Sequence, residues 1–276
     1  MIYDCFTYFN EDLLLELRLN YLNEIVDKFV IVEANKTHAG KSKPQNFDIN
    51  KFKQFADKII YVFLEDLPDA TDPWMLENIQ RNYIHEVLKK NNAKDDDIII
   101  VSDLDEIPTI ESISYYQRLN VDMVATFKMK FYNYYLNLLA ESEPSWLKAK
   151  IFKYKEFKKP VERLSNQLRN MCLIPECNET NTATRIRLQY MGLLIENGGW
   201  HFSWLGGPEK IKQKLQSFAH QEWNKEELTN IKHIEESLKE HKSVINLECS
   251  YKKVEIDDTY PKYLRDNLDK FKDYIL

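Results

Sequence analysis

The stretch Ile98-Ile-Ile-Val-Ser-Asp-Leu-Asp-Glu-Ile-Pro108 carries the pattern on which the fold prediction depends. It opens with four apolar residues in a row, which is typical of a strand buried on both faces. Two more runs of this kind come earlier in the chain, Lys28-Phe-Val-Ile-Val-Glu33 and Ile59-Ile-Tyr-Val-Phe63. Residues 74–90, between the second and third runs, place apolar residues at helical spacing. Apolar strands separated by helices predict an α/β protein whose sheet is covered by helices on both faces.

The second half of the chain follows a different pattern. Residues 121–139 are rich in Tyr, Phe and Met, which favours strands that pack aromatic surface around a pocket. Residues 208–223 have a helical pattern and begin with proline, a residue suited to the first turn of a helix. We predict one domain with a mixed sheet over residues 1–225, and a helical C-terminal extension over residues 226–276 that packs on it.

The composition limits the partners and the location of the protein. With 38 basic against 44 acidic residues among 276, the chain carries a formal net charge of −6. This charge argues against non-specific nucleic-acid binding, which requires a basic surface. The four cysteines are scattered, which indicates reduced thiols rather than a zinc site. No signal-peptide pattern is visible, and no apolar run approaches the roughly 18 residues of a membrane span. We therefore expect a cytoplasmic protein.

Carboxylates follow the third apolar run directly. Asp103 and Asp105 are two residues apart, so in extended backbone their side chains point the same way. The carboxyl end of a strand in an α/β sheet is also where ligands bind. Carboxylate oxygens suit a hard divalent ion such as Mn²⁺ or Mg²⁺, which could in turn neutralise a diphosphate. The pair predicts a functional site here, although acidic pairs also occur on solvated turns.

Two enzyme chemistries use a strand that ends in Asp-x-Asp. In nucleotide-sugar transferases the carboxylates bind a metal, and the metal binds the diphosphate leaving group. In haloacid-dehalogenase-like phosphatases the first Asp is the nucleophile, and Gly-Thr usually follows near the N-terminus. Here Glu106-Ile107 follows, about a hundred residues into the chain, which favours the transferase. A non-catalytic carbohydrate-binding protein is the third class.

A glycine-rich segment, Glu196-Asn-Gly-Gly-Trp-His-Phe-Ser-Trp-Leu-Gly-Gly-Pro208, is the second candidate site. Glycines let the backbone approach a ligand closely, and Trp200 and Trp204 could stack on a sugar or a base. His201 could bind a metal or donate to a phosphate. The alternative is a tight loop that packs its aromatic rings into the core.

Five segments, taken together, resemble glycosyltransferase family 17, the family of the β-1,4-mannosyl-glycoprotein β-1,4-N-acetylglucosaminyltransferases. The segments occur in order over residues 1 to about 225; they are residues 4–11, 32–33 with 37–41, 102–108, 199–203 and 217–222. The resemblance implies a GT-A-like fold, a nucleotide-sugar donor such as UDP-N-acetylglucosamine, a divalent metal and inversion at the anomeric carbon. Asp103 and Asp105 match the family's metal-binding Asp-x-Asp, and His201 lies in the matching Gly-Trp-His motif.

These expectations assign roles to single residues. Asp103, Asp105 and His201 are the predicted metal ligands, and Asp105 and His201 also assist departure of the diphosphate. Inversion needs a carboxylate base for the acceptor hydroxyl. Glu106 is the first candidate for this base, and the further candidates are Glu141, Glu143 and Glu196.

The remaining predicted donor contacts come from separate parts of the chain. Glu33 ends a predicted strand and could reach the nucleotide, and Arg81 could meet a phosphate, although either could equally be a surface ion pair. Gly199 and Trp200 are expected in the donor-site wall, and His220 is expected either there or on a solvated helix face. Residues 131–135 and Trp146 are candidates for the acceptor floor. A glycoprotein, a lipid-linked sugar and a polysaccharide all remain open as the acceptor.

Overall fold

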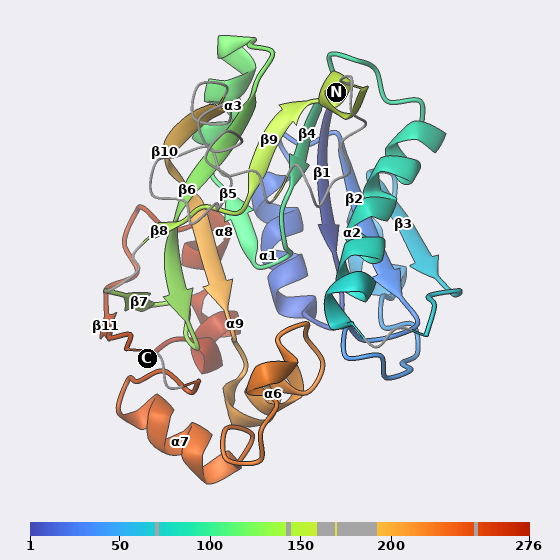
Figure 1. Cartoon of the computed structure of the whole chain (residues 1–276). Helices are drawn as coiled ribbons and strands as arrows, with labels where there is room; N and C mark the ends of the chain where they lie inside the picture. Colours follow the sequence, from blue (N-terminus) through green and yellow to red (C-terminus); the bar gives the residue numbers. More distant parts are fainter. Residues whose placement is uncertain (70–71, 142–144, 159–168, 170–191, 246–247) are drawn as a thin grey trace.

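The computed structural model describes residues 1–69, 72–141, 145–158, 169, 192–245 and 248–276 (Figure 1). Glu143 lies outside these described residues. In the described part, the strands join into one eleven-stranded mixed sheet, whose central order is β11-β7-β6-β9-β4-β1-β2-β3. No helix in this part is long and apolar enough to cross a membrane.

The N-terminal half of the sheet is parallel, as the apolar runs predict. Its four strands are β1 (Ile2–Thr7), β2 (Lys28–Ala34), β3 (Ile59–Leu64) and β4 (Ile98–Val101). Strand β1 pairs with β2 on one side and with β4 on the other, in parallel in both cases. The chain therefore runs outward from β1 through β2 to β3 and then returns to the opposite side of β1 with β4.

Helices cover both faces of this half because its strands are apolar on both sides. Phe6 and Ile31 pack on one face against the leucines of α1 (Asp12–Leu22). Cys5 and Val30 face the other way and pack with residues of α2 (Pro73–Lys90). In Figure 1, α1 and α2 accordingly lie on opposite faces of the sheet. Between β2 and β3 the chain forms a 3-10 helix, η1 (Ile49–Phe55).

The second half of the sheet contains the antiparallel pairs. Strand β9 pairs antiparallel with both β4 and β6, and β10 pairs parallel with β6 and antiparallel with β5. The strands are β5 (Glu106–Pro108), β6 (Val124–Asn133), β7 (Leu138–Ala140), β8 (Ser145–Trp146), β9 (Lys150–Lys153) and β10 (Gly192–Ser203). Helix α3 (Ile110–Leu119) and the 3-10 helix η2 (Tyr154–Lys158) complete this part. The predicted mixed α/β sheet flanked by helices is confirmed.

The helix predicted over residues 208–223 is shorter in the structure. Helix α6 spans Gly207–Leu215, and a separate 3-10 turn, η3, spans Gln221–Trp223. Between them, the hydroxyl of Ser217 donates to the carbonyl of Gln213 at 2.7 Å. The backbone then turns, and Phe218 and His220 line a large pocket instead of continuing the helix.

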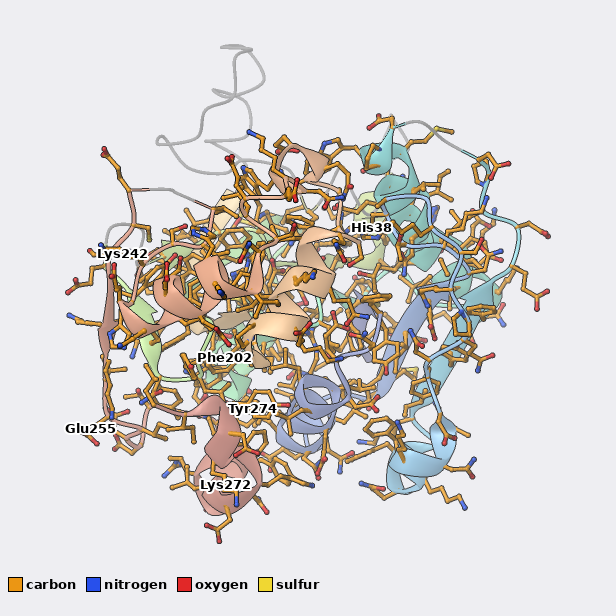
Figure 2. All side chains as sticks on the ribbon, turned by 90° about the horizontal axis from the view of Figure 1, so that it is seen from below. His38, Phe202, Lys242, Glu255, Lys272 and Tyr274 are labelled. Carbon is orange, nitrogen blue, oxygen red and sulfur yellow. The ribbon has the colours of Figure 1, made fainter. Side chains whose placement is uncertain are left out.

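The C-terminal residues combine helices with one strand. Strand β11 (Tyr251–Lys253) pairs antiparallel with β7. Tyr260, Leu264 and Phe271 are buried in the same apolar cluster as α1. In Figure 2, Glu255, Lys272 and Tyr274 of this segment lie along one side of the molecule. The helical elements are α7 (Ile231–Lys239), α8 (Lys262–Asp266), α9 (Leu268–Phe271) and the 3-10 helix η4 (Lys272–Tyr274).

Candidate active site

A cavity of about 920 Å³ opens at the carboxyl ends of the parallel strands. Its wall includes Thr7 at the end of β1, Lys36 after β2 and Asp103 after β4. Figure 2 views the molecule from this end, and the labelled His38 is one of the lining residues. The gap between β1 and β4 is the point at which the strand order reverses, and ligands of open α/β sheets bind at such points.

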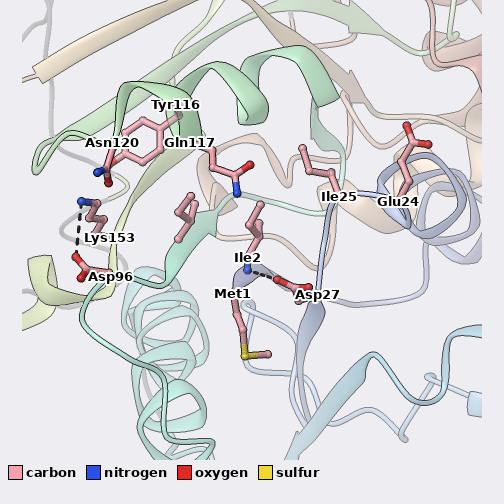
Figure 3. A pocket seen from close by; sticks show the side chains of 11 residues that line it. Met1, Ile2, Glu24, Ile25, Asp27, Asp96, Tyr116, Gln117, Asn120 and Lys153 are labelled. Atoms are coloured by element: carbon pink, nitrogen blue, oxygen red, sulfur yellow. Dashed lines mark hydrogen bonds and ion pairs between the residues drawn. The ribbon is translucent and has the colours of Figure 1, made fainter.

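A second cavity, of about 420 Å³, lies at the opposite end of β1 (Figure 3). Two of its acidic side chains already have partners: Asp27 accepts from the backbone N–H of Ile2 at 2.7 Å, and Asp96 lies 3.7 Å from the Lys153 ammonium. This cavity is smaller and lies away from the predicted site residues. The larger one is therefore the candidate active site.

A buried arginine holds the carboxylate loop in place. Arg18 of α1 is fully buried and forms a two-bond ion pair with Asp4 at 2.6 and 2.7 Å. Its Nη1 lies 2.8–3.0 Å from the backbone carbonyls of Asp103, Leu104 and Glu106, and its Nη2 donates to Ser102 Oγ at 2.6 Å. One guanidinium thus fixes the backbone of residues 102–106. The fixed backbone in turn determines how the side chains of this loop are oriented.

Asp103 lines the cavity between two arginines. Its Oδ1 accepts from Arg81 Nη2 at 2.7 Å, and its Oδ2 accepts from Arg169 Nη2 at 2.5 Å. Desolvation alone would raise the pKa of Asp103, but Arg169 and Arg81 outweigh it and hold this pKa well below its usual range. Asp103 is therefore ionised at neutral pH. Arg81, a predicted donor contact, lines the cavity, whereas Arg169 lies in a segment without a recognisable sequence pattern.

Asp105 lies between a lysine and a histidine. Its Oδ2 is 3.2 Å from the Lys214 ammonium, and its Oδ1 is 3.4 Å from His201 Nε2. Burial raises the pKa of Asp105, but Lys214 and His201 more than offset this, so the net pKa is strongly lowered. The imidazole of His201 is stacked on Phe131 at 5.0 Å and packed against Trp146 at 4.3 Å between ring centroids. Its Nδ1 is buried and has no hydrogen-bond partner among the described residues.

The carboxylate oxygens and the imidazole nitrogen at this end of the cavity are suitable ligands for a divalent ion that binds together with a diphosphate. Within the described residues, no group of three His, Cys, Asp or Glu side chains is gathered closely enough to hold a metal alone. Mg²⁺, however, is usually bound by one or two carboxylates together with substrate phosphates and waters. Asp103 and Asp105 are ionised and line one cavity with His201, whose Nε2 faces Asp105 and whose buried Nδ1 has no described partner. These residues fit such an ion.

Glu106, the first candidate for the base, does not line the cavity. Its side chain is fully buried, and one carboxylate oxygen accepts from the backbone N–H of Asp103 at 2.9 Å. The other oxygen accepts from Trp146 Nε1 and Arg169 Nη2. Glu106 is opposite His201 in the pairing of β5 with β10, and its partners Trp146 and Arg169 both line the cavity. Its buried carboxylate therefore anchors the loop and supports the cavity wall. We assign Glu106 a structural role.

Glu33 also lies away from the cavity. Its buried carboxylate accepts from the backbone N–H groups of Asn46 and Phe47 at 2.8 and 3.0 Å and from the Tyr61 hydroxyl at 2.8 Å, and it pairs with Lys43. These contacts hold the loop after β2. The structure therefore does not place Glu33 where it could reach a nucleotide in the cavity.

The alternation of β10 separates the residues of the Gly-Trp-His motif. His201 and Ser203 line the cavity, whereas Trp200 points away and packs edge-on against Tyr21 at 5.5 Å in the core. Gly199 has a φ of +147°, and a Cβ there would lie 2.1 Å from the Ile107 carbonyl oxygen. This glycine permits close pairing of β10 with β5. Neither Trp200 nor Gly199 lines the cavity.

The wall of the cavity also carries an aromatic group centred on His220. The imidazole stacks on Trp223 at 4.4 Å and meets Trp74 edge-on at 4.6 Å, and Nδ1 is 2.6 Å from Glu222 Oε1. Trp74 lies in the first turn of α2, so this contact joins two distant parts of the chain. The sequence motif indicated His220, whereas Trp74 carried no signal beyond its place in a helix.

Comparison with known proteins shows the protein family to which this chain is similar. A model of glycosyltransferase family 17 matches residues 1–170. The human β-1,4-mannosyl-glycoprotein 4-β-N-acetylglucosaminyltransferase is 25% identical in an alignment of 223 residues that covers 74% of this chain and 40% of the human protein. The mouse protein of the same name is 26% identical over 220 residues, with the same coverage. This chain thus spans about 40% of the length of the curated relatives it matches.

Among solved structures, the Francisella tularensis 2-C-methyl-D-erythritol 4-phosphate cytidylyltransferase is similar over 71% of this chain and 89% of that chain. The TM-score is 0.34 and the identity is 12%, a likeness too slight to argue from. The family match, in contrast, covers more than half of the chain and includes the carboxylate loop. The chain belongs to glycosyltransferase family 17.

Proposed function

We propose that the protein is a metal-dependent inverting glycosyltransferase that transfers N-acetylglucosamine from UDP-N-acetylglucosamine to a glycan acceptor. The observation that carries this proposal is the pair of ionised carboxylates, Asp103 and Asp105, surrounded by cations at the reversal point of the sheet. The names of the human and mouse relatives support the choice of the transferred sugar.

Cationic side chains supply the charge that a departing diphosphate requires. Arg81, Arg169 and Lys214 line the cavity beside the two carboxylates. Fixed cations that face a developing negative charge stabilise the transition state without reorganisation. Asp103 and Asp105 would hold Mn²⁺ or Mg²⁺, which acts as a Lewis acid for the leaving group when it is bound.

Inversion also needs a base that removes the proton of the acceptor hydroxyl. Two of the further candidates lie in surface ion pairs and do not line the cavity: Glu196 is 3.1 Å from Lys128, and Glu141 is 3.9 Å from Lys252. Glu248 does line the cavity and, within the described residues, has neither a hydrogen bond nor an ion pair. We therefore assign the base to Glu248.

The test measures donor binding and turnover separately. Calorimetry should show that UDP binds more tightly with Mn²⁺ than without it, and UDP release from UDP-N-acetylglucosamine should require the metal. Asp105→Asn keeps the shape of the side chain but removes its charge, so we expect turnover to fall about 100-fold or more. Asp122→Asn is the matched control, because Asp122 is an exposed carboxylate that pairs with Lys153 and Lys155.

Two results would contradict the proposal. Hydrolysis of p-nitrophenyl phosphate without any response to nucleotide sugars would favour a phosphatase. Glycan binding that is indifferent to UDP, metal and Asp105→Asn would favour a non-catalytic carbohydrate-binding protein. Glu248→Gln separates the base from the donor site, since it should abolish transfer while leaving UDP affinity unchanged. Transfer by Glu248→Gln at the wild-type rate would exclude Glu248 as the base.

A further inference from the structure

The cavity continues past the charged residues along two neighbouring strands. On β6 and β10, His201 pairs in register with Phe131, and Ser203 pairs with Asn133. Residues two apart in a strand share a face and are separated by roughly 6–7 Å, which is about the width of a sugar ring. Asn133 and Ser203 therefore lie one step beyond the Asp105–His201 contact, and both line the cavity.

Two buried polar atoms in this part of the cavity lack partners among the described residues. The amide nitrogen of Asn133 donates to the Tyr251 hydroxyl at 3.0 Å, while its Oδ1 accepts no hydrogen bond from them. If the amide is turned over, its nitrogen is left without a partner instead. Ser243 Oγ interacts with the Tyr134 hydroxyl, but within the described part of the chain it has no partner that meets hydrogen-bond geometry. Asn133 and Ser243 are each 5% exposed. Buried polar groups are nearly always paired, so these two indicate a ligand that supplies the missing bonds.

The backbone beside these atoms is held in an uncommon conformation. Tyr134 directly follows Asn133 and has a φ of +67°; Trp204 directly follows Ser203 and has a φ of +58°. Bulky residues rarely adopt positive φ. The chain therefore turns directly after β6 and directly after β10, at the paired residues Asn133 and Ser203. The rings of Tyr134 and Trp204 form part of the cavity wall. The wall thereby gains flat apolar faces next to the unpaired amide and hydroxyl.

Lys214 borders this part of the cavity, because its Nζ lies 3.5 Å from Ser203 Oγ and 5.6 Å from the centre of the Trp204 ring. The cations beside the carboxylate loop are engaged by its two aspartates. Arg81 and Arg169 both pair with Asp103, and Lys214 pairs with Asp105. We call the surface formed by Asn133, Tyr134, Ser203, Trp204, Ser243 and Tyr251 the uncharged wall. It offers amide and hydroxyl groups and aromatic rings, and none of its six side chains is a cation that would pair with a phosphate or a carboxylate.

We propose that the uncharged wall is the subsite for a neutral pyranose of the acceptor. Sugar hydroxyls both donate and accept, so one ring can satisfy Asn133 Oδ1 and Ser243 Oγ together. The C–H face of the ring can then pack on an aromatic side chain. This inference rests on the proposed function, which places the donor diphosphate at the charged end. It also assigns part of acceptor recognition to residues beyond the matched range of 1–170.

The test titrates the full chain, loaded with UDP and Mn²⁺, with methyl α-D-mannopyranoside and methyl β-D-galactopyranoside, and follows binding by saturation-transfer NMR. Glucuronic acid and glucose 6-phosphate are the anionic counterparts. At least one neutral glycoside should bind, and the anions should bind more weakly. Ser243→Ala and Asn133→Ala should each weaken glycoside binding about 2- to 10-fold, which corresponds to the loss of one or two neutral hydrogen bonds. The affinity for UDP should stay unchanged in both variants.

Ser237→Ala is the matched control. Ser237 is buried in the same C-terminal segment, does not line the cavity, and donates to the His233 carbonyl at 2.9 Å. Thermal unfolding checks the fold of each variant, and Ser243→Ala should melt close to the wild type because the contact of its hydroxyl with Tyr134 lacks hydrogen-bond geometry. Asn133→Ala provides the second measurement if either serine variant fails to fold.

The outcomes separate this proposal from the proposed function. If UDP binds with Mn²⁺ but neither glycoside binds, or if both cavity variants bind a glycoside as the wild type does, the subsite is overturned. Preference for the anionic sugars would overturn it as well. If UDP does not bind but a neutral glycoside does, and Ser243→Ala weakens that binding, the subsite stands and the transferase proposal fails.

Discussion

At the scale of single residues, Lys214 determines the charge state of Asp105. The carboxylate keeps a strongly lowered pKa because Lys214 and His201 outweigh the effect of burial. Since the pKa is lower in the folded than in the unfolded protein, this contact stabilises the fold above about pH 4, and the contribution is lost as the pH falls through the lowered value.

Lys214→Met should raise the pKa of Asp105 toward its usual range. The acid limb of the pH–activity profile should then move to higher pH, so activity should fall more at pH 5 than at pH 7.5. Initial rates of UDP release across this range measure the shift. Lys212→Met, on the same helix but outside the cavity wall, is the control. An acid limb that stays in place would show that Asp105 does not limit activity at low pH.

The sequence indicated some cavity residues correctly and others not, for identifiable reasons. Asp103, Asp105 and His201 follow from local motifs, and all three line the cavity. Glu106 is adjacent in sequence, but its carboxylate is buried against Asp103, Trp146 and Arg169 and does not line the cavity. The cations that hold the carboxylates come from distant segments, and Arg169 in particular has no local pattern that could have marked it. Local spacing predicts which residues project from one strand end, but not which side chains from elsewhere meet them.

At the scale of secondary-structure elements, β1 is the strand of the parallel half that the sequence did not reveal. Its segment, Ile2-Tyr-Asp-Cys-Phe-Thr7, contains a charged residue in the middle, which breaks the apolar run that identified β2, β3 and β4. Asp4 can be buried there only because Arg18 pairs with it from α1. The strand at the centre of the parallel half therefore depends on a side chain that is fourteen residues away.

The pairing of β10 with β5 depends on Gly199. We expect Gly199→Ala to destabilise the protein by about 2 kcal/mol or more, because the new methyl group would meet the Ile107 carbonyl and the residue would keep a positive φ. Urea unfolding followed by circular dichroism measures the loss. Gly207→Ala is the comparison, since Gly207 also has a positive φ, +76°, but a methyl group added there would meet no described atom within 4 Å. Equal losses in the two variants would rule out the steric explanation.

At the scale of the whole molecule, the C-terminal segment contributes to the main core. Tyr260, Leu264 and Phe271 are buried in the cluster that also contains α1 and β6 residues. The division at residue 225 stays a prediction, and these contacts suggest how to test it. The segment also carries Ser243, Glu248 and Tyr251 to the cavity. No recognisable motif marked these three residues in the sequence.

A chain that ends at residue 225 should lose cooperative unfolding, because removal of the segment exposes the apolar surface that Leu264 and Phe271 cover. Thermal unfolding and near-UV circular dichroism of the shortened and full chains make the comparison. Leu264→Asp should reproduce much of the effect in the full chain, whereas Lys262→Asp, on the same helix and exposed, should not. A shortened chain that melts cooperatively near the full-length temperature would show that residues 1–225 fold independently.

The Arg18 cluster has a consequence for the thermodynamics of binding. Its bonds to three carbonyls, to Ser102 and to Asp4 are formed when the protein folds, before any ligand arrives. The conformational entropy of residues 102–106 is therefore lost during folding. A ligand that meets Asp103 and Asp105 does not have to order this loop, so more of the interaction free energy is retained as affinity.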